Sequence, residues 1–319
     1  MIKAIAVVGP TAVGKTSFSV SLAKMVGGEI ISCDSMQIYR YMDIGTAKAT
    51  YAERCGVPHH MIDILTPDVK YSAKDYAGDA LMCASDISNR GRIPIFCGGT
   101  GLYLDAVRYG RLEDDGCHDY EYTRTLTEQA QQPGGVDMLY GMLMKADPES
   151  ARTIHKNNVR RVIRALEIYH STGFTKSERD VESKTKSLNI DMLVIGLCSS
   201  SRDVLYDRIN ARVDKMIENG LANEVRSLYE KGYLSPDYTA AQAIGYKEML
   251  PYIKGEASLT QCIEDLKTSS RRYAKRQMTW FSRTEGIIWL ETDKCGIPVP
   301  FETAYDAVKS KIDNFLSKK

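Results

Sequence analysis

The sequence predicts an α/β fold in which helices flank a parallel sheet and a helical domain is inserted into the chain. Short apolar strands alternate with helical periodicity up to about residue 110, and strands that alternate with helices form parallel sheets. After a long helical stretch, an apolar run at residues 190–197 resumes the strand pattern. We therefore expect a core made of residues 1–114 and 188–319, and a helical insertion made of residues 115–187.

Three strands in the first part of the chain each end in a glycine-rich or polar turn. The strands are residues 5–8, 29–32 and 93–97, with a loop predicted at residues 39–51 and a helix at residues 75–90. Ligands of parallel sheets bind beyond the carboxyl ends of the strands. We therefore expect the three turns to meet in one crevice.

The rest of the chain is predicted to be mostly helical. In the insertion, the periodicity breaks at residues 131–135 and 171–173, and the polar residues 177–187 are predicted to form an exposed linker. After the strand at residues 190–197, the pattern predicts helices at residues 202–219, 222–231, 245–253 and 259–283, a strand at 286–290 and a helix from residue 301.

The first turn contains the complete phosphate-loop pattern G-x-x-x-x-G-K-[ST] between a strand and a helix. Its glycines let successive backbone N–H groups point at an anion, and the helix N-terminus adds partial positive charge. Lys15 reaches the distal phosphate and Thr16 offers a hydroxyl to Mg²⁺. The spacing predicts a P-loop NTPase-like core that binds a polyphosphate. The residues predicted to bind it are Gly9, Pro10, Thr11, Ala12, Val13, Gly14, Lys15 and Thr16.

The composition is that of a globular protein without a strong global attraction for polyanions. The 319 residues carry a formal net charge of +1, and 43% of them are hydrophobic and 26% charged. No apolar run reaches the roughly 20 residues that span a bilayer, and the first strand leaves no room for a signal peptide. The eight cysteines form no CxxC or CxxH pair, which favours reduced thiols over a zinc site or disulfides. We expect a cytoplasmic protein that does not associate with membranes.

Asp34 follows the second strand, at the mouth of the expected crevice. A carboxylate beside a bound polyphosphate is repelled unless it holds Mg²⁺ or accepts a proton from a second substrate. A helix N-cap is an equally good interpretation from sequence alone, and Asp43 and Asp63 are weaker candidates for the same chemistry.

The third strand ends at residues 96–98 without the acid that many P-loop enzymes carry there. A Mg²⁺ ion would therefore depend on Thr16 and Asp34, together with water and phosphate oxygens. The missing acid argues against an ordinary ATPase, and the glycines at this turn leave space for a closely approaching substrate.

Two basic clusters interrupt the neutral charge balance. Residues 152–164 hold five basic residues and no acid, and residues 271–283 hold five basic residues interleaved with Tyr273, Trp280 and Phe281. Cations for phosphates beside aromatics for unstacked bases are typical of proteins that bind looped RNA. Solvated helix faces have the same composition. Two acid-free clusters together favour a polyanion larger than a nucleotide.

The chain resembles the bacterial tRNA dimethylallyltransferases over nearly its whole length, because nine motifs occur in the order of that family. They are GPTAVGKT (9–16), DSMQIYR (34–40), DIGTAK (43–48), GVPHHMIDI (56–64), GGTGLYL (98–104), VRRVIRALE (159–167), GLANEV (220–225), QAIGYKE (242–248) and AKRQMTWF (274–281). The resemblance implies transfer of the dimethylallyl group from dimethylallyl diphosphate to N6 of the adenosine directly 3′ of the anticodon (tRNA position 37), with release of diphosphate. It also implies Mg²⁺ as the cofactor and the anticodon stem-loop of a tRNA as the partner.

The resemblance also implies roles for individual residues. Asp34 would take the proton from N6, and Arg212 would bind the diphosphate, although a structural role in the helical layer suits Arg212 equally well. The implied catalytic residues are Lys15, Thr16, Asp34, Thr100 and Arg212, with Thr16 as the metal ligand. The implied tRNA contacts are Asp34, Ser35, Met36, Gln37, Thr100, Arg124, Arg160, Arg161, Val162, Ile163, Arg164, Gln242, Ala243, Ile244, Gly245, Tyr246 and Lys247. Two positions depart from the family pattern: Val13, where Ser is usual, and Ala49, where Pro is usual.

Three other functions fit parts of the sequence. An adenylate dimethylallyltransferase, which acts on free AMP, ADP or ATP, resembles the core but needs neither the insertion nor the basic clusters. A P-loop small-molecule kinase fits the phosphate loop, and a non-catalytic RNA-binding protein fits the basic clusters. A monomer is expected, because no long apolar stripe requires a partner.

Overall fold

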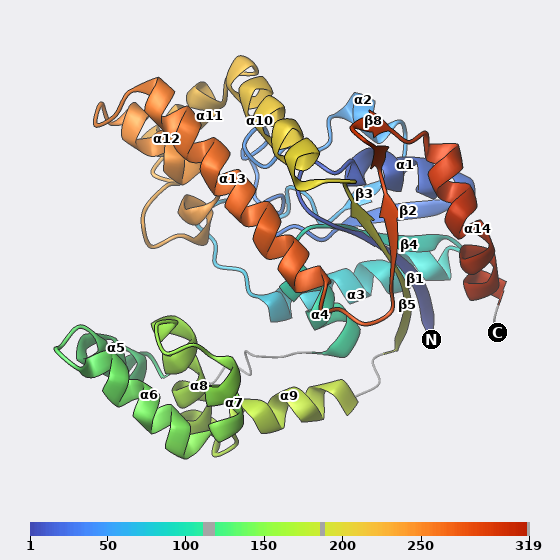
Figure 1. The fold of residues 1–319 in the computed structure, drawn as a ribbon. Helices are drawn as coiled ribbons and strands as arrows, with labels where there is room; N and C mark the ends of the chain where they lie inside the picture. The colour runs from blue at the N-terminus through green and yellow to red at the C-terminus, as the bar shows by residue number, and fades with distance from the viewer. Residues whose placement is uncertain (111–118, 186–188, 318–319) are drawn as a thin grey trace. The chain divides into compact units, whose positions relative to one another are not determined.

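The computed structural model describes residues 1–110, 119–185 and 189–317, and it divides the chain into two compact units (Figure 1). The first unit comprises Met1–Tyr71, Asp75–Leu104 and Asn189–Lys319, and the second comprises Ser72–Lys74 and Asp105–Leu188. The boundaries that the sequence suggests, at residues 114/115 and 187/188, lie outside the described residues.

The first unit is built on a parallel sheet, which confirms the predicted fold class. Within the described residues the sheet has six strands in the order β3-β2-β4-β1-β5-β6, and every pairing is parallel. Their bounds are β1 Ile2–Val8, β2 Gly28–Ser32, β3 His59–His60, β4 Ile93–Gly98, β5 Ile190–Cys198 and β6 Ile287–Glu291. Val8 lies opposite both Gly98 and Gly196, and Ser32 lies opposite Cys97. The turns that follow β1, β2 and β4 therefore begin at the same level of the sheet.

Helices connect these strands and end the chain. Their bounds are α1 Lys15–Val26, α2 Tyr51–Arg54, α3 Ala73–Asn89, α4 Gly101–Tyr109, α10 Arg202–Glu218, α11 Leu221–Glu230, the 3₁₀ turn η1 Thr239–Gln242, α12 Tyr246–Ile253, α13 Leu259–Phe281 and α14 Phe301–Ser317. A short hairpin, β7 Asp293–Lys294 and β8 Ile297–Pro298, precedes α14. The helix predicted at residues 75–90 corresponds to α3, and the helices predicted after β5 likewise agree with these bounds to within a few residues. No helix of the described part of the chain is long and apolar enough to cross a membrane.

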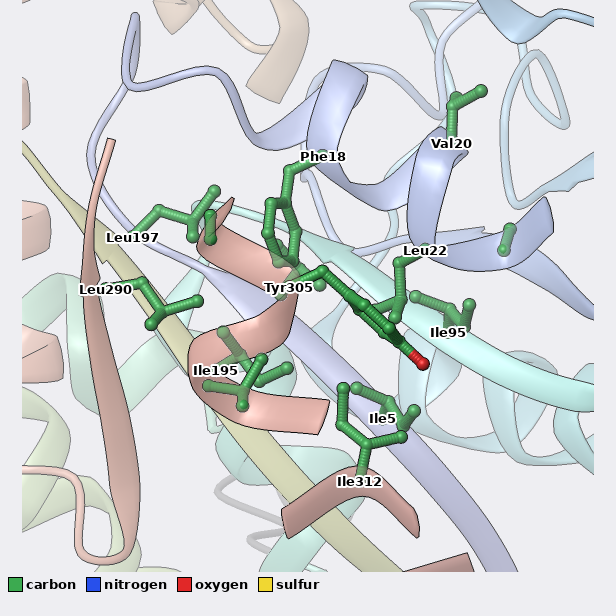
Figure 2. Packing of buried hydrophobic residues seen from close by; sticks show 14 of the residues in the cluster. Ile5, Phe18, Val20, Leu22, Ile95, Ile195, Leu197, Leu290, Tyr305 and Ile312 are labelled. Carbon is green, nitrogen blue, oxygen red and sulfur yellow. The ribbon is translucent and has the colours of Figure 1, made fainter. Parts of the chain in front are cut away.

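Helices α1 and α14 cover one face of the sheet with an apolar layer (Figure 2). Ile5, Leu22, Ile195 and Ile312 are each fully buried in this layer. Burying such a side chain contributes about 1.5–3 kcal/mol, so the layer fixes the phosphate loop between β1 and α1. Val13, which stands where the related family usually has Ser, also packs here and is 1% exposed.

Helices α10 to α13 form a second apolar cluster, on the side of the unit away from α14 (Figure 1). The segment after β2 packs into it through Ile38, Tyr39 and Met42, which are fully buried. The predicted loop at residues 39–51 is thus held against helices that lie nearly two hundred positions later in the chain.

The second unit is helical and has its own core. Its helices are α5 Tyr120–Ala130, α6 Gly135–Ala146, α7 Pro148–Thr153, α8 Val159–Thr172 and α9 Lys176–Thr185. Leu126, Leu139, Leu143, Val162 and Leu166 are all buried against one another. The predicted breaks at residues 131–135 and 171–173 fall between helices, where Gly134 and Gly173 take left-handed conformations with φ of 76° and 74°.

The prediction of an exposed linker at residues 177–187 is wrong for its described part, which is helix α9. Thr175 and Glu178 form a reciprocal cap: the Thr175 N–H donates to Glu178 Oε2 at 2.8 Å, and the Glu178 N–H donates to Thr175 Oγ1 at 3.2 Å. Ser177 then anchors the first turn, because its hydroxyl donates to Asp147 Oδ1 at 2.7 Å. A polar composition hid this helix, whose start is fixed by side-chain capping and not by an apolar stripe.

Candidate functional site

A cavity of about 730 Å³ lies beyond the carboxyl ends of β1, β2 and β4. The three turns expected to converge all contribute to its wall, through Lys15, Asp34 and Gly98. The opposite wall comes from α10, α12 and α13, including Arg212, Lys247 and residues 273–277 in part. The volume is that of a site for a small molecule or for part of a larger one.

The phosphate loop adopts a conformation that only certain residues accept. Gly9 and Gly14 have φ of 143° and 90°, and Ala12 between them is also left-handed at 65°. A Cβ atom on Gly9 would lie 2.3 Å from the Leu197 carbonyl oxygen, so no larger residue fits there. Because α1 begins at Lys15, its N-terminal amides and the loop open on the cavity.

The predicted polyphosphate-binding residues divide into two groups in the structure. Thr11, Ala12, Gly14, Lys15 and Thr16 line the cavity. The other three support them: the carbonyl oxygens of Gly9 and Pro10 accept from Lys15 Nζ at 3.0 and 2.7 Å, and Val13 is buried in the core.

Among the charged residues that line this cavity, Lys15, Arg212 and Asp34 influence one another's charge. Burial lowers the pKa of the Lys15 ammonium to about 8, with Arg212 adding to the effect and Asp34 opposing it. Burial also lowers the pKa of the Arg212 guanidinium, which Asp34 and Glu53 oppose. Burial disfavours the charged form of both groups, and a polyanion beside them would favour that form again. Arg212, which the sequence left between a binding and a structural role, lies in the cavity wall.

Asp34 lies in a turn and does not cap a helix in the described residues. Its Oδ1 accepts from the Met36 N–H at 2.9 Å, and the side chain lines the cavity. Of the weaker candidates, Asp43 and Asp63 both pair with the buried Lys48 ammonium. Asp34 is therefore the carboxylate of the three whose position suits a proton acceptor.

The neighbours of Asp34 are held from two sides. Ser35, Met36 and Gln37 line the cavity, and the Gln37 amide bridges Ser32 Oγ at 3.0 Å and the Thr46 carbonyl at 3.2 Å. Gln37 is thus engaged within the protein at both ends of its amide.

Thr100 does not line the cavity but supports the Asp34 turn from behind. Its Oγ1 accepts from the Ser35 N–H at 3.1 Å, and its own N–H donates to the Cys33 carbonyl at 3.2 Å. The preceding Gly98 is required because a Cβ there would lie 1.9 Å from the Cys33 oxygen. The glycines were predicted to leave space for a substrate; Gly98 lines the cavity, and the close contact between two protein segments is a further reason for a glycine there.

Two polar residues that the sequence reasoning did not single out organise the site. Glu224 accepts from the backbone N–H groups of residues 43–45 at 2.8 to 3.1 Å and from the Tyr246 hydroxyl at 2.6 Å. Gln277 bonds to the Thr11 N–H at 2.8 Å and to the Gly99 carbonyl at 3.0 Å. The helical period of α13 could have indicated Gln277, because it places this residue on the buried face of the helix. A polar side chain on a buried face needs a hydrogen-bond partner.

The segment 242–247 was predicted as one tRNA-contacting stretch, and the structure divides it. Gln242 and Lys247 are exposed and line the cavity, together with Ala243 and Ile244. Gly245 and Tyr246 are buried, and Tyr246 is fully enclosed. Burial, followed by the negative charge of Glu224, raises the pKa of the Tyr246 hydroxyl. Predicting Tyr246 as a direct tRNA contact was wrong for its side chain, which anchors the loop at residues 43–45.

The segment 160–164 is divided in the same way. Val162 and Ile163 are 1% and 6% exposed and belong to the core of the helical unit, so predicting their side chains as tRNA contacts was wrong. Arg160 and Arg161 are exposed on α8. Arg164 is half-buried and donates to Glu167 at 2.6 Å. The buried positions follow from the helical period, since residues next to exposed arginines turn toward the core.

The acid-free run at residues 152–164 is less basic in the folded chain than in the sequence. Arg152 pairs with Glu149, and Lys156 pairs with Asp137 at 2.6 Å. Arg124, predicted as a further contact in this unit, is 74% exposed and lies 3.6 Å from Glu128. The remaining positive charge is concentrated on the exposed arginines of α8.

The basic run at residues 271–283 has a similar split. Arg272, Lys275 and Arg276 are exposed on α13, and Arg276 lies over the ring of Tyr273 at 5.6 Å. Tyr273 lines the cavity, whereas Phe281 is 1% exposed and cannot stack on a base, contrary to its predicted role.

Comparison with known proteins matches the chain to two isopentenyl transferase family models and to tRNA dimethylallyltransferases. The family model described as IPP transferase matches residues 37–284, and the one described as isopentenyl transferase matches residues 2–63. A tRNA dimethylallyltransferase from Geobacillus thermodenitrificans is 48% identical over 311 residues, 97% of each chain. One from Bacillus subtilis is 48% identical over 284 residues, 89% of each chain.

Solved structures agree with these matches. The tRNA isopentenylpyrophosphate transferase from Bacillus halodurans has a TM-score of 0.71 and 44% identity, with 99% of this chain and 97% of that chain covered. A eukaryotic dimethylallyltransferase acting on tRNA has a TM-score of 0.83 and 32% identity, with 100% of this chain and 81% of that chain covered.

Proposed function

The chain belongs to the IPP transferase family, and on this premise we propose that it transfers a dimethylallyl group from dimethylallyl diphosphate to a tRNA. The acceptor is N6 of the adenosine directly 3′ of the anticodon, and diphosphate is released. The names of the relatives support the donor, the acceptor molecule and the reaction class.

A single observation carries the proposal: one cavity joins an anion-binding loop to the carboxylate of Asp34. Lys15 and Arg212 provide positive charge on the loop side, and Asp34 lines the same cavity. Group transfer between a diphosphate and an amine needs a cradle for the leaving group and an acceptor for a proton. An ordinary ATPase needs the first but usually also an acid at the end of β4, where this chain has Cys97.

Departure of the diphosphate is assisted by the loop, Lys15 and Arg212. The bond between the allylic carbon and the diphosphate oxygen breaks, and its electron pair leaves with the diphosphate. Negative charge therefore grows on the leaving group, where positioned N–H groups and cations stabilise it most. With a pKa of about 8, Lys15 is still mostly protonated at neutral pH.

The adenosine amine attacks the allylic carbon and loses a proton to Asp34. A carbon–nitrogen bond forms at N6, and the carboxylate takes the proton that the nitrogen can no longer hold. Asp34 has a single hydrogen bond from Met36 among the described residues, so one carboxylate oxygen remains for this proton. N6 must leave the base stack to reach Asp34 in the cavity wall.

We propose that Mg²⁺ is the cofactor and that it binds in the site together with the diphosphate. The described residues contain no group of three or more His, Cys, Asp or Glu side chains that could hold a metal. The Thr16 hydroxyl, in the cavity wall, would therefore hold the ion together with diphosphate oxygens and water. Bound there, it would neutralise charge on the leaving group.

The tRNA is proposed to be bound by exposed basic residues on both units. Arg160 and Arg161 on α8, and Arg272, Lys275 and Arg276 on α13, are all exposed. Such side chains bind phosphates and position an RNA without reading its sequence. Gln242 and Lys247, at the cavity wall, would contact the nucleotides nearest the reacting adenosine.

The test is nucleoside mass analysis after incubation of the purified chain with dimethylallyl diphosphate and unmodified tRNA. An adenosine heavier by one dimethylallyl group minus one hydrogen, mapped to the position after the anticodon, is the expected product. Parallel reactions with AMP, ADP or ATP as acceptor test the adenylate branch, and ATP with small alcohols tests a kinase. Prenylation of the free nucleotide but not of tRNA would overturn the proposal, and tRNA binding without any transfer would favour a non-catalytic RNA-binding protein.

We propose further that the enzyme acts as a monomer in the cytoplasm. None of the seven described cysteines forms a disulfide, as expected of a protein from a reducing compartment. Light scattering of the purified protein, with and without tRNA, tests the oligomeric state.

A further inference from the structure

One buried side chain, Gln277 of α13, joins the phosphate loop to the turn after β4. Its Oε1 accepts from the Thr11 N–H at 2.8 Å, and its Nε2 donates to the Gly99 carbonyl at 3.0 Å. Gln277 is 5% exposed. A Cβ atom on Gly99 would lie 1.9 Å from Nε2, so the turn is shaped around this amide. Both ends of the Gln277 amide are therefore engaged by backbone groups of two separate strand ends.

The connection continues from Gly99 to the Asp34 turn. Thr100 follows directly, and its N–H donates to the Cys33 carbonyl at 3.2 Å. Its Oγ1 accepts from the Ser35 N–H at 3.1 Å. Hydrogen bonds thus link the loop that holds the leaving group to the turn that carries the proton acceptor. Helix α13 contributes Gln277 to this link, and Tyr273 of the same helix interacts through its hydroxyl with Thr100 and Gln277.

We propose that Gln277 is a positioning residue that sets the separation between the diphosphate in the phosphate loop and the adenosine amine beside Asp34. The role rests on the proposed function, because two substrates must be brought together only if a group is transferred between them. Reacting atoms have to approach within about 3–3.5 Å, and a misplacement of about 1 Å can cost about 10²-fold in rate. By holding the two binding turns at a fixed separation, the Gln277 amide would control that distance through the turns themselves.

The chemistry of an amide makes this role testable. A side chain at this position needs one acceptor, for the Thr11 N–H, and one donor, for the Gly99 carbonyl. A glutamate in the same place is an acceptor only when ionised, but when protonated it has one donor and one acceptor. Burial favours the protonated form of such a carboxyl. Gln277→Glu should therefore lose the hydrogen bond to the Gly99 carbonyl at high pH and regain it as the pH falls.

The experiment measures kcat and the KM for dimethylallyl diphosphate and for tRNA in the wild type, Gln277→Glu and Gln277→Leu, from about pH 9 to about pH 6. At the alkaline end, kcat of Gln277→Glu should be at least about tenfold below that of the wild type. The ratio of the two should rise toward one as the pH falls, whereas Gln277→Leu should stay low throughout. The Kd for tRNA should be unchanged in both variants. The control is Gln261→Glu, the same substitution at an exposed position of α13.

Circular dichroism at each pH establishes which variants are folded. If Gln277→Leu does not fold, the pH dependence of the kcat ratio between Gln277→Glu and the wild type is the deciding result. A ratio that is independent of pH, or a loss confined to the KM of one substrate, would overturn the positioning role. Absence of transfer by the wild type would instead overturn the proposed function, and this role with it.

Discussion

Substituting Glu29, a buried carboxylate of β2, should remove a large electrostatic contribution to the stability of the sheet-containing unit. Glu29 is 3% exposed. Arg90 donates to both of its oxygens, to Oε2 at 2.9 Å, and His60 Nε2 lies 2.7 Å from Oε2. The Arg90 hydrogen bonds and then His60 lower the pKa of Glu29 from 4.5 to about 2, against the opposing effect of burial.

The size and the sign of the effect follow from that pKa. Each pKa unit is worth about 1.4 kcal/mol, so lowering the pKa from 4.5 to about 2 corresponds to about 3 kcal/mol of stability. Because the folded-state pKa is the lower one, this contribution is complete above about pH 5 and is lost as the pH falls toward 2. Glu29→Gln should therefore lower the free energy of unfolding by about 3 kcal/mol at neutral pH and flatten its acid dependence.

Urea unfolding followed by tryptophan fluorescence measures this effect. Both tryptophans of the chain, Trp280 and Trp289, lie in the sheet-containing unit and report on it. The control is Asp86→Asn, which removes the exposed partner of Arg90, 68% exposed and 3.0 Å from it. Exposed ion pairs contribute about 0–1 kcal/mol. Equal losses for the two variants, or an unchanged acid dependence in Glu29→Gln, would refute the reasoning.

Three further predictions concern the site. Asp34→Asn should lower single-turnover prenyl transfer by about 10³-fold while the tRNA Kd changes little, because only proton transfer is removed; near-normal turnover would exclude Asp34 as the base. Replacing Arg160 and Arg161 by Ala should reduce the slope of log affinity for tRNA against log salt by about 1 per lost phosphate contact, in filter-binding titrations; an unchanged slope would mean that neither contacts phosphate. Glu224→Ala leaves three loop amides without their acceptor, so hydrogen exchange at those amides should accelerate and stability fall by about 2–4 kcal/mol; exchange as slow as in the wild type would contradict this role.

The phosphate loop could be predicted because its signals are local. Gly9 and Gly14 are required by the conformation of their own backbone, and Lys15 and Thr16 follow at fixed spacing where a helix begins. Asp34 could be placed at the same edge of the sheet because parallel strands bring their carboxyl ends together. These inferences use only chain direction, period and glycine geometry, and the sheet register agrees with them.

Errors in the site predictions share one physical cause: a motif is continuous in sequence, but a helix turns its residues to different sides. Val162 and Ile163 turn into the core beside exposed arginines, and Tyr246 turns inward to Glu224 while Lys247 remains exposed. Membership in a motif therefore does not distinguish a residue that contacts substrate from one that holds the contacting residue in place.

By itself, the sequence determined the parallel sheet, the cradle for a polyphosphate and the carboxylate across from it, since each depends on short-range pattern and strand direction. Only the tertiary structure decided which polar groups hold these parts together. Gln277 reaches the phosphate loop across 266 positions of sequence, and Glu224 reaches the loop at residues 43–45 across about 180. A buried polar side chain needs a partner, and the fold alone determines which distant backbone group meets that need.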